Sequence, residues 1–284
     1  MRVLISVDME GLPDIFYTGM EGGASDPGYA EGRKTMTLLS SALAEGYHSA
    51  GIEDIVIADA HGNMVNLVYS SLPDFVKVVK GGIRQLDMIH GIDRSVDALA
   101  MLGFHAAAGT ARSSFDHTYD GSTFHRILVN GEPASEFHLC TLVAGEYGVP
   151  VILVAGDDKL RAEVERIAPW ATYAQLKESS GYWSSTYDSL SDIQSALRAA
   201  AKLSIASLAG KGRKRARALV ARPPIEFVFE MKRSVYADVG ELVPGMKRGD
   251  GYTLMYRAGS AAEGYRVMQL LSYSSIGTEK SLTE

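Results

Sequence analysis

The sequence predicts an α/β fold, with a three-layer α/β/α arrangement around a mostly parallel sheet and a smaller C-terminal α+β portion. Two kinds of segment carry this prediction. Short apolar runs, such as RVLISV at residues 2–7 and DIVIAD at 54–59, flank a segment of helical periodicity at residues 29–49. Strands without a polar face belong to parallel sheets that helices cover on both sides, so this βαβ unit indicates the architecture.

Later runs extend the same pattern along the chain. We expect further strands of the parallel sheet over residues 75–79, 97–104, 126–129 and 151–156. A helix is expected over residues 134–147, before the last of these strands. Each run is short and mostly apolar, which is typical of a strand buried between two layers of helices.

The pattern changes after about Ser179. Residues 179–188 are polar and aromatic without periodicity, and residues 190–208 are helical in composition, which suggests a linker and a crossover. Beyond them we expect a strand at 225–231, a turn-rich segment at 241–251, a strand at 252–257 and a closing helix at 261–273. The chain is thus divided into an α/β domain over residues 1–180 and a smaller α+β domain over 181–284. The boundary is approximate, and the chain can cross it more than once.

The composition is that of an ordinary globular protein. The 284 residues are 46% hydrophobic and 22% charged, enough for one large domain or two unequal ones. A formal net charge of -6 gives no general attraction to nucleic acid or to an anionic membrane, so neither is an expected partner. No apolar stretch approaches the roughly 20 residues of a membrane span and no secretory leader is visible, so the cytoplasm is the expected compartment. The single cysteine, Cys140, excludes an internal disulfide and a cysteine-rich zinc site.

Five acidic and histidine residues in the first half of the chain are candidate metal ligands. They are Asp8, Glu10, His61, His105 and Glu136. Four of them stand where a strand-like run ends. The carboxyl ends of parallel strands converge at one edge of an open α/β sheet, and ligands bind in the crevice there. We therefore expect these side chains to meet in one metal-centred site.

Each candidate also has an ordinary structural explanation when it is taken alone. Asp8 and Glu10 suit a helix cap or a solvated turn, and a lone His61 suits a structural role. Glu136 lies in the first turn of the expected helix, where the helix dipole favours a carboxylate. Together, however, three carboxylates and two imidazoles are costly to bury without counter-charge. Two divalent cations would supply that charge, so we expect a dinuclear site, with zinc favoured and another divalent metal as the alternative.

Six short motifs resemble those of a known family. They are SVDMEG at residues 6–11, DAHGNMVNL at 59–67, LGFHA at 102–106, VNGEPASEF at 129–137, VPVILVAGDD at 149–158 and LVPGMKRGDG at 242–251. In order and spacing they resemble the metal-dependent D-aminopeptidases of the DppA type, whose founding member was first named a dipeptide transport protein. The resemblance runs from the first residues into the last hundred.

The resemblance implies a site and an activity. The family's metal ligands fall on the same five positions, and its catalytic histidine falls on His117 in SSFDHTYD. It implies a zinc-dependent aminopeptidase that acts on short peptides with a free N-terminus, of the D-alanine type. It also implies a ring-like homo-oligomer, a decamer with its sites facing an internal cavity. Asp116, Thr118 and Tyr119 set His117 in surroundings that depart from the family's pattern, which leaves the substrate preference open.

The expected mechanism is hydrolysis by water that a metal pair activates. The metal pair would also bind the α-amino group and the scissile carbonyl. His117 would stabilise the oxyanion, move a proton to the leaving amine, or attack the carbonyl directly. Two other classes stay open: another dinuclear metallohydrolase, such as an amidohydrolase or a phosphoesterase, and a non-catalytic dipeptide-binding protein. The handedness of the substrate is implied by the family alone.

Overall fold

Seven strands form the larger of two sheets in the computed structural model, which describes residues 1–22, 26–209, 211 and 215–283. Their order across the sheet is β3-β2-β1-β4-β7-β8-β9. The strands are β1 (Arg2–Val7), β2 (Asp54–Asp59), β3 (Val76–Val79), β4 (Ala98–Phe104), β7 (Val151–Asp157), β8 (Thr172–Gly181) and β9 (Ser184–Thr186). All neighbours pair in parallel except β8 and β9, which form an antiparallel hairpin at one edge.

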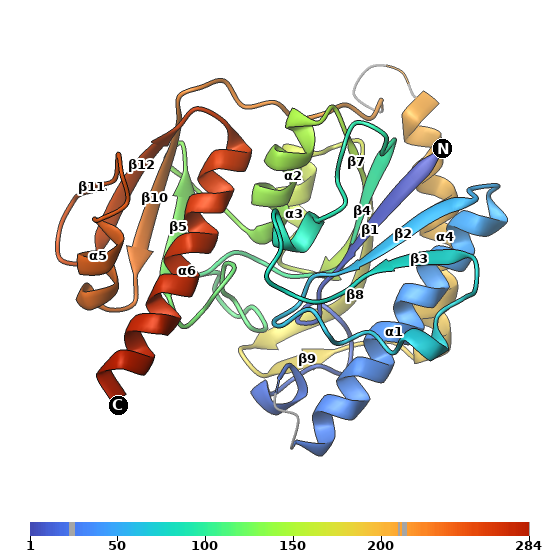
Figure 1. The fold of residues 1–284 in the computed structure, drawn as a ribbon. Coiled ribbons are helices and arrows are strands. Elements are labelled where there is room, and N and C mark those ends of the chain that lie inside the picture. The colour runs from blue at the N-terminus through green and yellow to red at the C-terminus, as the bar shows by residue number, and fades with distance from the viewer. Residues whose placement is uncertain (23–25, 210, 212–214, 284) are drawn as a thin grey trace.

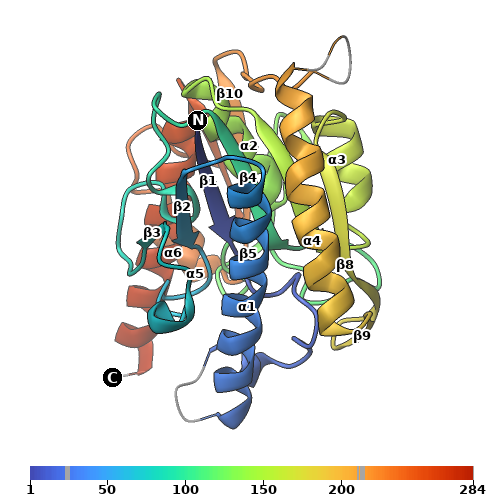
Figure 2. The same cartoon turned by 90° about the vertical axis from the view of Figure 1, so that its right-hand side faces the viewer.

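Helices cover both faces of this sheet, as the apolar strands predict. α1 (Pro27–Ser49) and α4 (Leu190–Ile205) lie side by side on one face, which Figure 2 shows toward the viewer. α2 (Glu136–Glu146) and α3 (Arg161–Ile167) pack on the other face. Successive strand residues point to opposite faces, so Ile5 joins the core under α1 while Leu4 joins the core under α2. The predicted three-layer α/β architecture is confirmed.

A second, antiparallel sheet stands beside the first (Figure 1). Its order is β11-β12-β10-β5-β6, and it carries two helices. Its elements are β5 (Phe124–Val129), β6 (Glu132–Pro133), β10 (Ile225–Met231), α5 (Ser234–Gly240), β11 (Lys247–Arg248), β12 (Thr253–Ala258) and α6 (Ala261–Thr283). α6 contacts β10 and β12 of this sheet and also α2 of the larger layer, so it joins the two parts.

The structure corrects three expectations about single segments. The run at residues 126–129 is a strand, but it belongs to the antiparallel sheet, because β5 buries only alternate side chains on one apolar face. Residues 179–181 and 184–186 are not a linker but part of the β8–β9 hairpin, whose exposed edge position accounts for its polar sequence. The closing helix extends past residue 273 to Thr283.

The division near residue 180 stays a prediction, and the chain passes between the two sheets on both sides of it. β5 and β6 come before this point but pair with β10, and α4 comes after it but packs on α1. Within the described ranges, none of the helices combines the length and the apolarity needed to cross a lipid bilayer.

Candidate metal centre

Three neighbouring strands deliver candidate ligands to the same edge of the larger sheet. Asp8 follows β1, His61 follows β2 by two residues, and His105 follows β4. Glu10 lies in the turn after β1, and Glu136 is the first residue of α2. All five side chains are almost fully buried. The structure therefore brings together every residue that the sequence placed in one site.

Two glycines allow the chain after β1 to approach the end of β4 closely. The Gly11 N–H donates to the Gly103 carbonyl at 2.7 Å. Gly103 has a φ of +78°, and a Cβ there would lie 2.1 Å from the backbone oxygen of Asp8. Only glycine adopts this conformation at low cost and leaves room for the neighbouring backbone. The spacing of Asp8 and His105 thus depends on a missing side chain.

The donor atoms form two groups that share Asp8. In the first, the Nδ1 atom of His61 lies 3.3 Å from Asp8 Oδ1 and 2.9 Å from Glu10 Oε2. In the second, the Nε2 atom of His105 lies 3.7 Å from Asp8 Oδ2 and 3.5 Å from Glu136 Oε1. Within each group the potential ligand atoms lie within 4.8 Å of one another. Asp8 thus presents one carboxylate oxygen to each group, and each group combines carboxylate and imidazole donors, which divalent cations bind.

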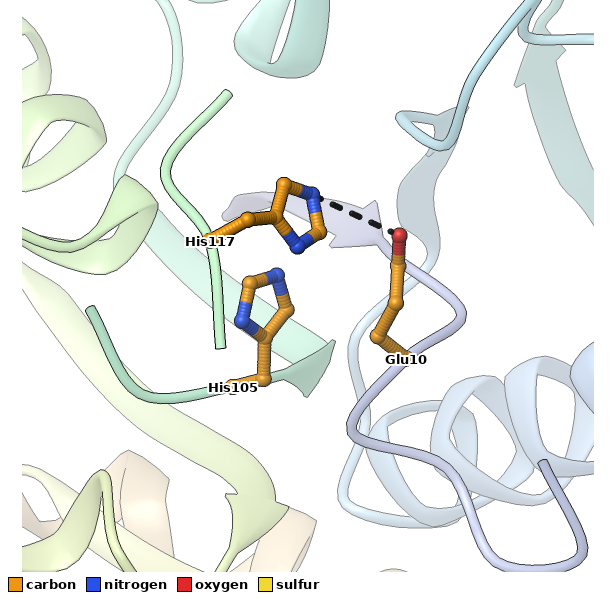
Figure 3. A group of neighbouring side chains, drawn as sticks. All are labelled: Glu10, His105 and His117. Atoms are coloured by element: carbon orange, nitrogen blue, oxygen red, sulfur yellow. Dashed lines mark ion pairs between the residues drawn. The ribbon is translucent and has the colours of Figure 1, made fainter. Parts of the chain in front are cut away.

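His117 completes a third group with Glu10 and His105 (Figure 3). Its Nε2 atom lies 3.6 Å from Glu10 Oε1 and 3.5 Å from Glu136 Oε1, and its ring stacks on that of His105 at 4.4 Å. At 19% exposure, its side chain is the most accessible of the six. His117 therefore stands between the buried cluster and the open space in front of it.

The three imidazoles share one orientation. Each places one ring nitrogen against a backbone carbonyl, and since a carbonyl only accepts, that nitrogen carries the hydrogen. The donors are His61 Nε2 to Glu21 O at 2.7 Å, His105 Nδ1 to Ala106 O at 3.0 Å and His117 Nδ1 to Phe115 O at 2.8 Å. The other nitrogen of each ring faces the carboxylates with a lone pair when the ring is neutral. Metal-binding histidines are held in the same way.

The electrostatics of the cluster are those of a site that needs a cation. Burial raises the pKa of Asp8 well above its ordinary value, and the charges of Glu10 and Glu136 add to this shift. Burial is the largest single effect on His105 and acts to lower its pKa, but Glu136, Glu10 and Asp8 together outweigh burial and raise the pKa well above its ordinary value. Burial also opposes ionisation of Glu136, yet the facing His105 lowers its pKa to about 2. A divalent ion that binds between these carboxylates and imidazoles would displace the protons that they hold.

Two buried atoms of the cluster lack any hydrogen-bond partner: Asp8 Oδ2 and His105 Nε2. Unsatisfied buried polar atoms are rare and costly in folded proteins. Both atoms belong to the second group, together with Glu136. The donor set of carboxylate oxygens and imidazole nitrogens, with two atoms unpaired, fits zinc.

Sequence reasoning missed two residues that hold the cluster in place. Lys177, within β8, is buried and donates to the backbone oxygens of Glu10 and Ile15 and to Ser114 Oγ. Burial lowers the pKa of this lysine to about 8. The Tyr119 N–H donates to Glu136 Oε1 at 2.7 Å. Local sequence gives no signal for this role, because the lysine's partners Glu10 and Ile15 lie more than 160 residues away in the chain and Ser114 lies 63 residues away.

A cavity of about 620 Å³ opens in front of the cluster. The carboxylates of Asp8, Glu10 and Glu136 and the rings of His61 and His117 form one wall. Ser272, Tyr273 and Ile276 of α6 contribute to the lining from the second part of the molecule. The cavity is large enough for a short peptide, and His117 is one of the residues that line it.

Comparison with known proteins agrees with the resemblance seen in the sequence. The sequence model of the peptidase M55 family, described as D-aminopeptidase, matches residues 1–270. A D-aminopeptidase of Bacillus subtilis (strain 168) is 33% identical over 183 residues, which are 63% of this chain and 64% of that protein. The alignment therefore spans just under two thirds of the relative.

A solved structure has the same fold. It is described as the Zn-dependent D-aminopeptidase DppA from Bacillus subtilis, a self-compartmentalizing protease, and it matches with a TM-score of 0.89 at 24% identity. The match covers 96% of this chain and 97% of the other. Because the family model accounts for nearly the whole sequence, this chain belongs to the peptidase M55 family of D-aminopeptidases.

Proposed function

We propose that this chain is a zinc-dependent aminopeptidase that removes an N-terminal D-amino acid from short peptides. One observation carries the proposal: three imidazoles, each fixed by a backbone carbonyl, turn their second nitrogen toward three buried carboxylates. The relatives support it, since the Bacillus subtilis protein of the same fold is described as a Zn-dependent D-aminopeptidase.

Two zinc ions would be held by five side chains. Glu10 and His61 would hold one ion, His105 and Glu136 would hold the other, and Asp8 belongs to both groups and would be shared by them. Zinc, when bound, polarises a carbonyl and lowers the pKa of bound water toward neutrality. Lys177 keeps the Glu10 turn in place, and the Tyr119 N–H keeps the Glu136 carboxylate in place.

His117 would act without being a ligand. Its Nδ1 hydrogen is held by the Phe115 carbonyl, so Nε2 is the nitrogen that can take up a proton at the cavity wall. This nitrogen lies 3.6 Å from Glu10 Oε1 and 3.5 Å from Glu136 Oε1, so it faces the candidate metal site directly. The ring can then return the proton to the leaving amine or stabilise an oxyanion. The same lone pair would serve a direct attack on the carbonyl.

The lining of the cavity favours a peptide over a phosphate ester. Among the described residues, five carboxylates face this space and neither lysine nor arginine does. A phosphoryl substrate needs cationic clamps for its oxygens. The phosphoesterase alternative is therefore the weaker of the hydrolase classes.

Assembly and location complete the proposal. We expect a closed homo-oligomer, because the structural relative is described as self-compartmentalizing. The family resemblance makes a decamer the expected number of subunits. Light scattering on the purified chain measures the subunit number, and a fully active monomer would exclude a role for compartments. The cytoplasmic location stays a prediction.

The decisive experiment compares three reporters on one preparation. The zinc-loaded protein should release p-nitroaniline from D-alanine p-nitroanilide and less of it from L-alanine p-nitroanilide. It should release no nitrophenol from p-nitrophenyl phosphate. A chelator should abolish turnover, and added zinc should restore it. The variant His117→Ala should keep its zinc content by elemental analysis and lose turnover by at least about a hundredfold. Full activity in this variant, or turnover of none of the reporters after zinc loading, would contradict the proposal.

A further inference from the structure

A fourth carboxylate lines the cavity and keeps one oxygen without a hydrogen-bond partner. Asp87 is fully buried and lines the same cavity as the candidate metal ligands. Its Oδ2 atom accepts from the Tyr119 hydroxyl, and the Tyr273 hydroxyl lies 3.4 Å away. Its Oδ1 atom has no hydrogen-bond partner. A buried carboxylate with a free oxygen is costly to maintain unless a ligand completes it.

The nearby guanidinium of Arg84 contacts the backbone of Asp87 rather than its carboxylate. Three of its N–H groups donate to the backbone oxygens of Asp87, Gly81 and Asp59, and its charge acts on Asp87 only through space. Asp120 also lines the cavity, yet both of its oxygens are occupied: Ser122 and Thr123 donate to Oδ1, and Thr123 and Ser272 donate to Oδ2. Asp87 is therefore the acid in this wall that retains a free acceptor.

Asp87 stands apart from the position of the scissile bond. Tyr119 connects the two regions, because its N–H binds Glu136 and its hydroxyl binds Asp87. The two carboxylates are thus bound to opposite ends of one tyrosine. The α-amine of a substrate is only two bonds from the carbonyl that is cleaved, so it stays near the metal cluster. A group that reaches Asp87 must sit at the end of a longer side chain.

The surroundings of Asp87 suit an aliphatic chain that ends in a positive charge. Met64, Met88 and Ile276 line the same cavity and offer apolar contacts to methylene groups. The hydroxyl groups of Tyr119 and Tyr273 contact Oδ2 of the carboxylate and leave Oδ1 as the oxygen that can accept from a cation. Among the described residues of the lining, no lysine or arginine would repel an incoming ammonium group.

We propose that Asp87 is a specificity residue that binds the side-chain ammonium of the substrate's N-terminal residue. The protein would then prefer peptides that begin with a basic residue of the lysine or ornithine type. This inference rests on the proposed aminopeptidase function, since it places the scissile carbonyl at the metal cluster. A charge-assisted hydrogen bond of this kind corresponds to a preference of about 10- to 100-fold.

The test uses two substrates that differ in one group. The p-nitroanilides of D-lysine and D-norleucine share their carbon chain up to the terminal methylene, but only lysine carries the ammonium. For the zinc-loaded wild type, kcat/KM should be at least tenfold higher for the lysyl compound. In Asp87→Asn the ratio should fall to about one, while Asp120→Asn should keep the wild-type ratio. A wild-type ratio of one, or an Asp87→Asn ratio as high as that of the wild type, would overturn the proposal.

Binding measurements test the ammonium site at Asp87 independently of whether the protein is an aminopeptidase. If neither compound is hydrolysed, the aminopeptidase assignment fails, but calorimetry with D-lysinamide and D-norleucinamide still measures the role of Asp87. Tenfold tighter binding of the lysine amide to the wild type, lost in Asp87→Asn, supports the ammonium site. Equal binding of the two amides to the wild type rejects it, and this comparison needs no variant. Circular dichroism checks that Asp87→Asn remains folded.

Discussion

The close approach of Gly103 to the backbone of Asp8 gives a sharp test of how the fold positions the cluster. Gly103 in β4 has a φ of +78°, and an added Cβ would lie 2.1 Å from the Asp8 carbonyl oxygen and 2.8 Å from its carbon. The variant Gly103→Ala therefore combines two costs. Positive φ costs a residue with a side chain roughly 1–2 kcal/mol. The overlap with backbone that cannot rotate away adds roughly 1–3 kcal/mol, as overpacking does in a core.

Gly148 provides the matched control. Its φ is +80°, but nothing lies within 4 Å of the position a Cβ would take. Gly148→Ala should therefore lose only the conformational part, roughly 1–2 kcal/mol of unfolding free energy. The difference between the two variants isolates the contact with Asp8. Urea unfolding of the zinc-free proteins measures it, and we expect Gly103→Ala to be less stable than the control by roughly 1–3 kcal/mol.

Zinc affinity is the second readout of the same pair. Relief of the overlap must move the backbone of Asp8, the residue proposed to bridge the two ions. Displacement of a supporting group lowers metal affinity by roughly 10- to 100-fold, so competition with a chromophoric chelator should show this loss in Gly103→Ala alone. Equal stability and equal zinc affinity in the two alanine variants would refute the idea that this glycine sets the spacing of the ligands.

Two further predictions concern charges in the cluster. Lys177→Met should lower the unfolding free energy by roughly 1–3 kcal/mol, because the carbonyls of Glu10 and Ile15 lose their buried donor; Ser114→Ala is the milder comparison, and an unchanged urea midpoint would contradict the role of the lysine. Asp8→Asn should abolish zinc binding yet stabilise the zinc-free protein relative to the wild type. The pKa of Asp8 is raised above its ordinary value of 3.8, so its contribution to stability is present below that pH and is lost as pH rises toward the folded pKa. The advantage of Asp8→Asn should therefore grow with rising pH in urea titrations, and an advantage that shrinks would refute the sign.

Much of the site could be predicted from the sequence, because the topology of a parallel sheet brings the residues that follow its strands to one edge. Asp8, His61 and His105 lie far apart in the chain, yet each follows a strand of one parallel sheet. Parallel strands end at a common edge, so a polar residue after each strand is enough to predict a meeting point. Their role as zinc ligands stays a prediction, and their proximity is a feature of the structure.

Other parts of the structure could not be read from local pattern. The run at residues 126–129 is too short to show whether one face or both are buried, so its place in the second sheet was not visible. Lys177 and Asp87 are ordinary charged residues in the sequence. Their buried positions depend on contacts with residues far away in the chain, such as Glu10 for the lysine and Tyr273 for the aspartate.

The two ends of Tyr119 suggest how cleavage and selection are kept separate in one cavity. Its backbone N–H holds Glu136 of the metal cluster, and its hydroxyl holds Asp87 at the other end of the side chain. A carboxylate in contact with the cluster would compete for zinc, whereas one held at the far end of a rigid ring stays available to the substrate. The ring also fixes the distance between the two acids, because a phenol has few rotatable bonds. The change Asp87→Asn keeps an acceptor for the Tyr119 hydroxyl, so we expect it to alter which peptide is accepted while the Tyr119 N–H still holds Glu136.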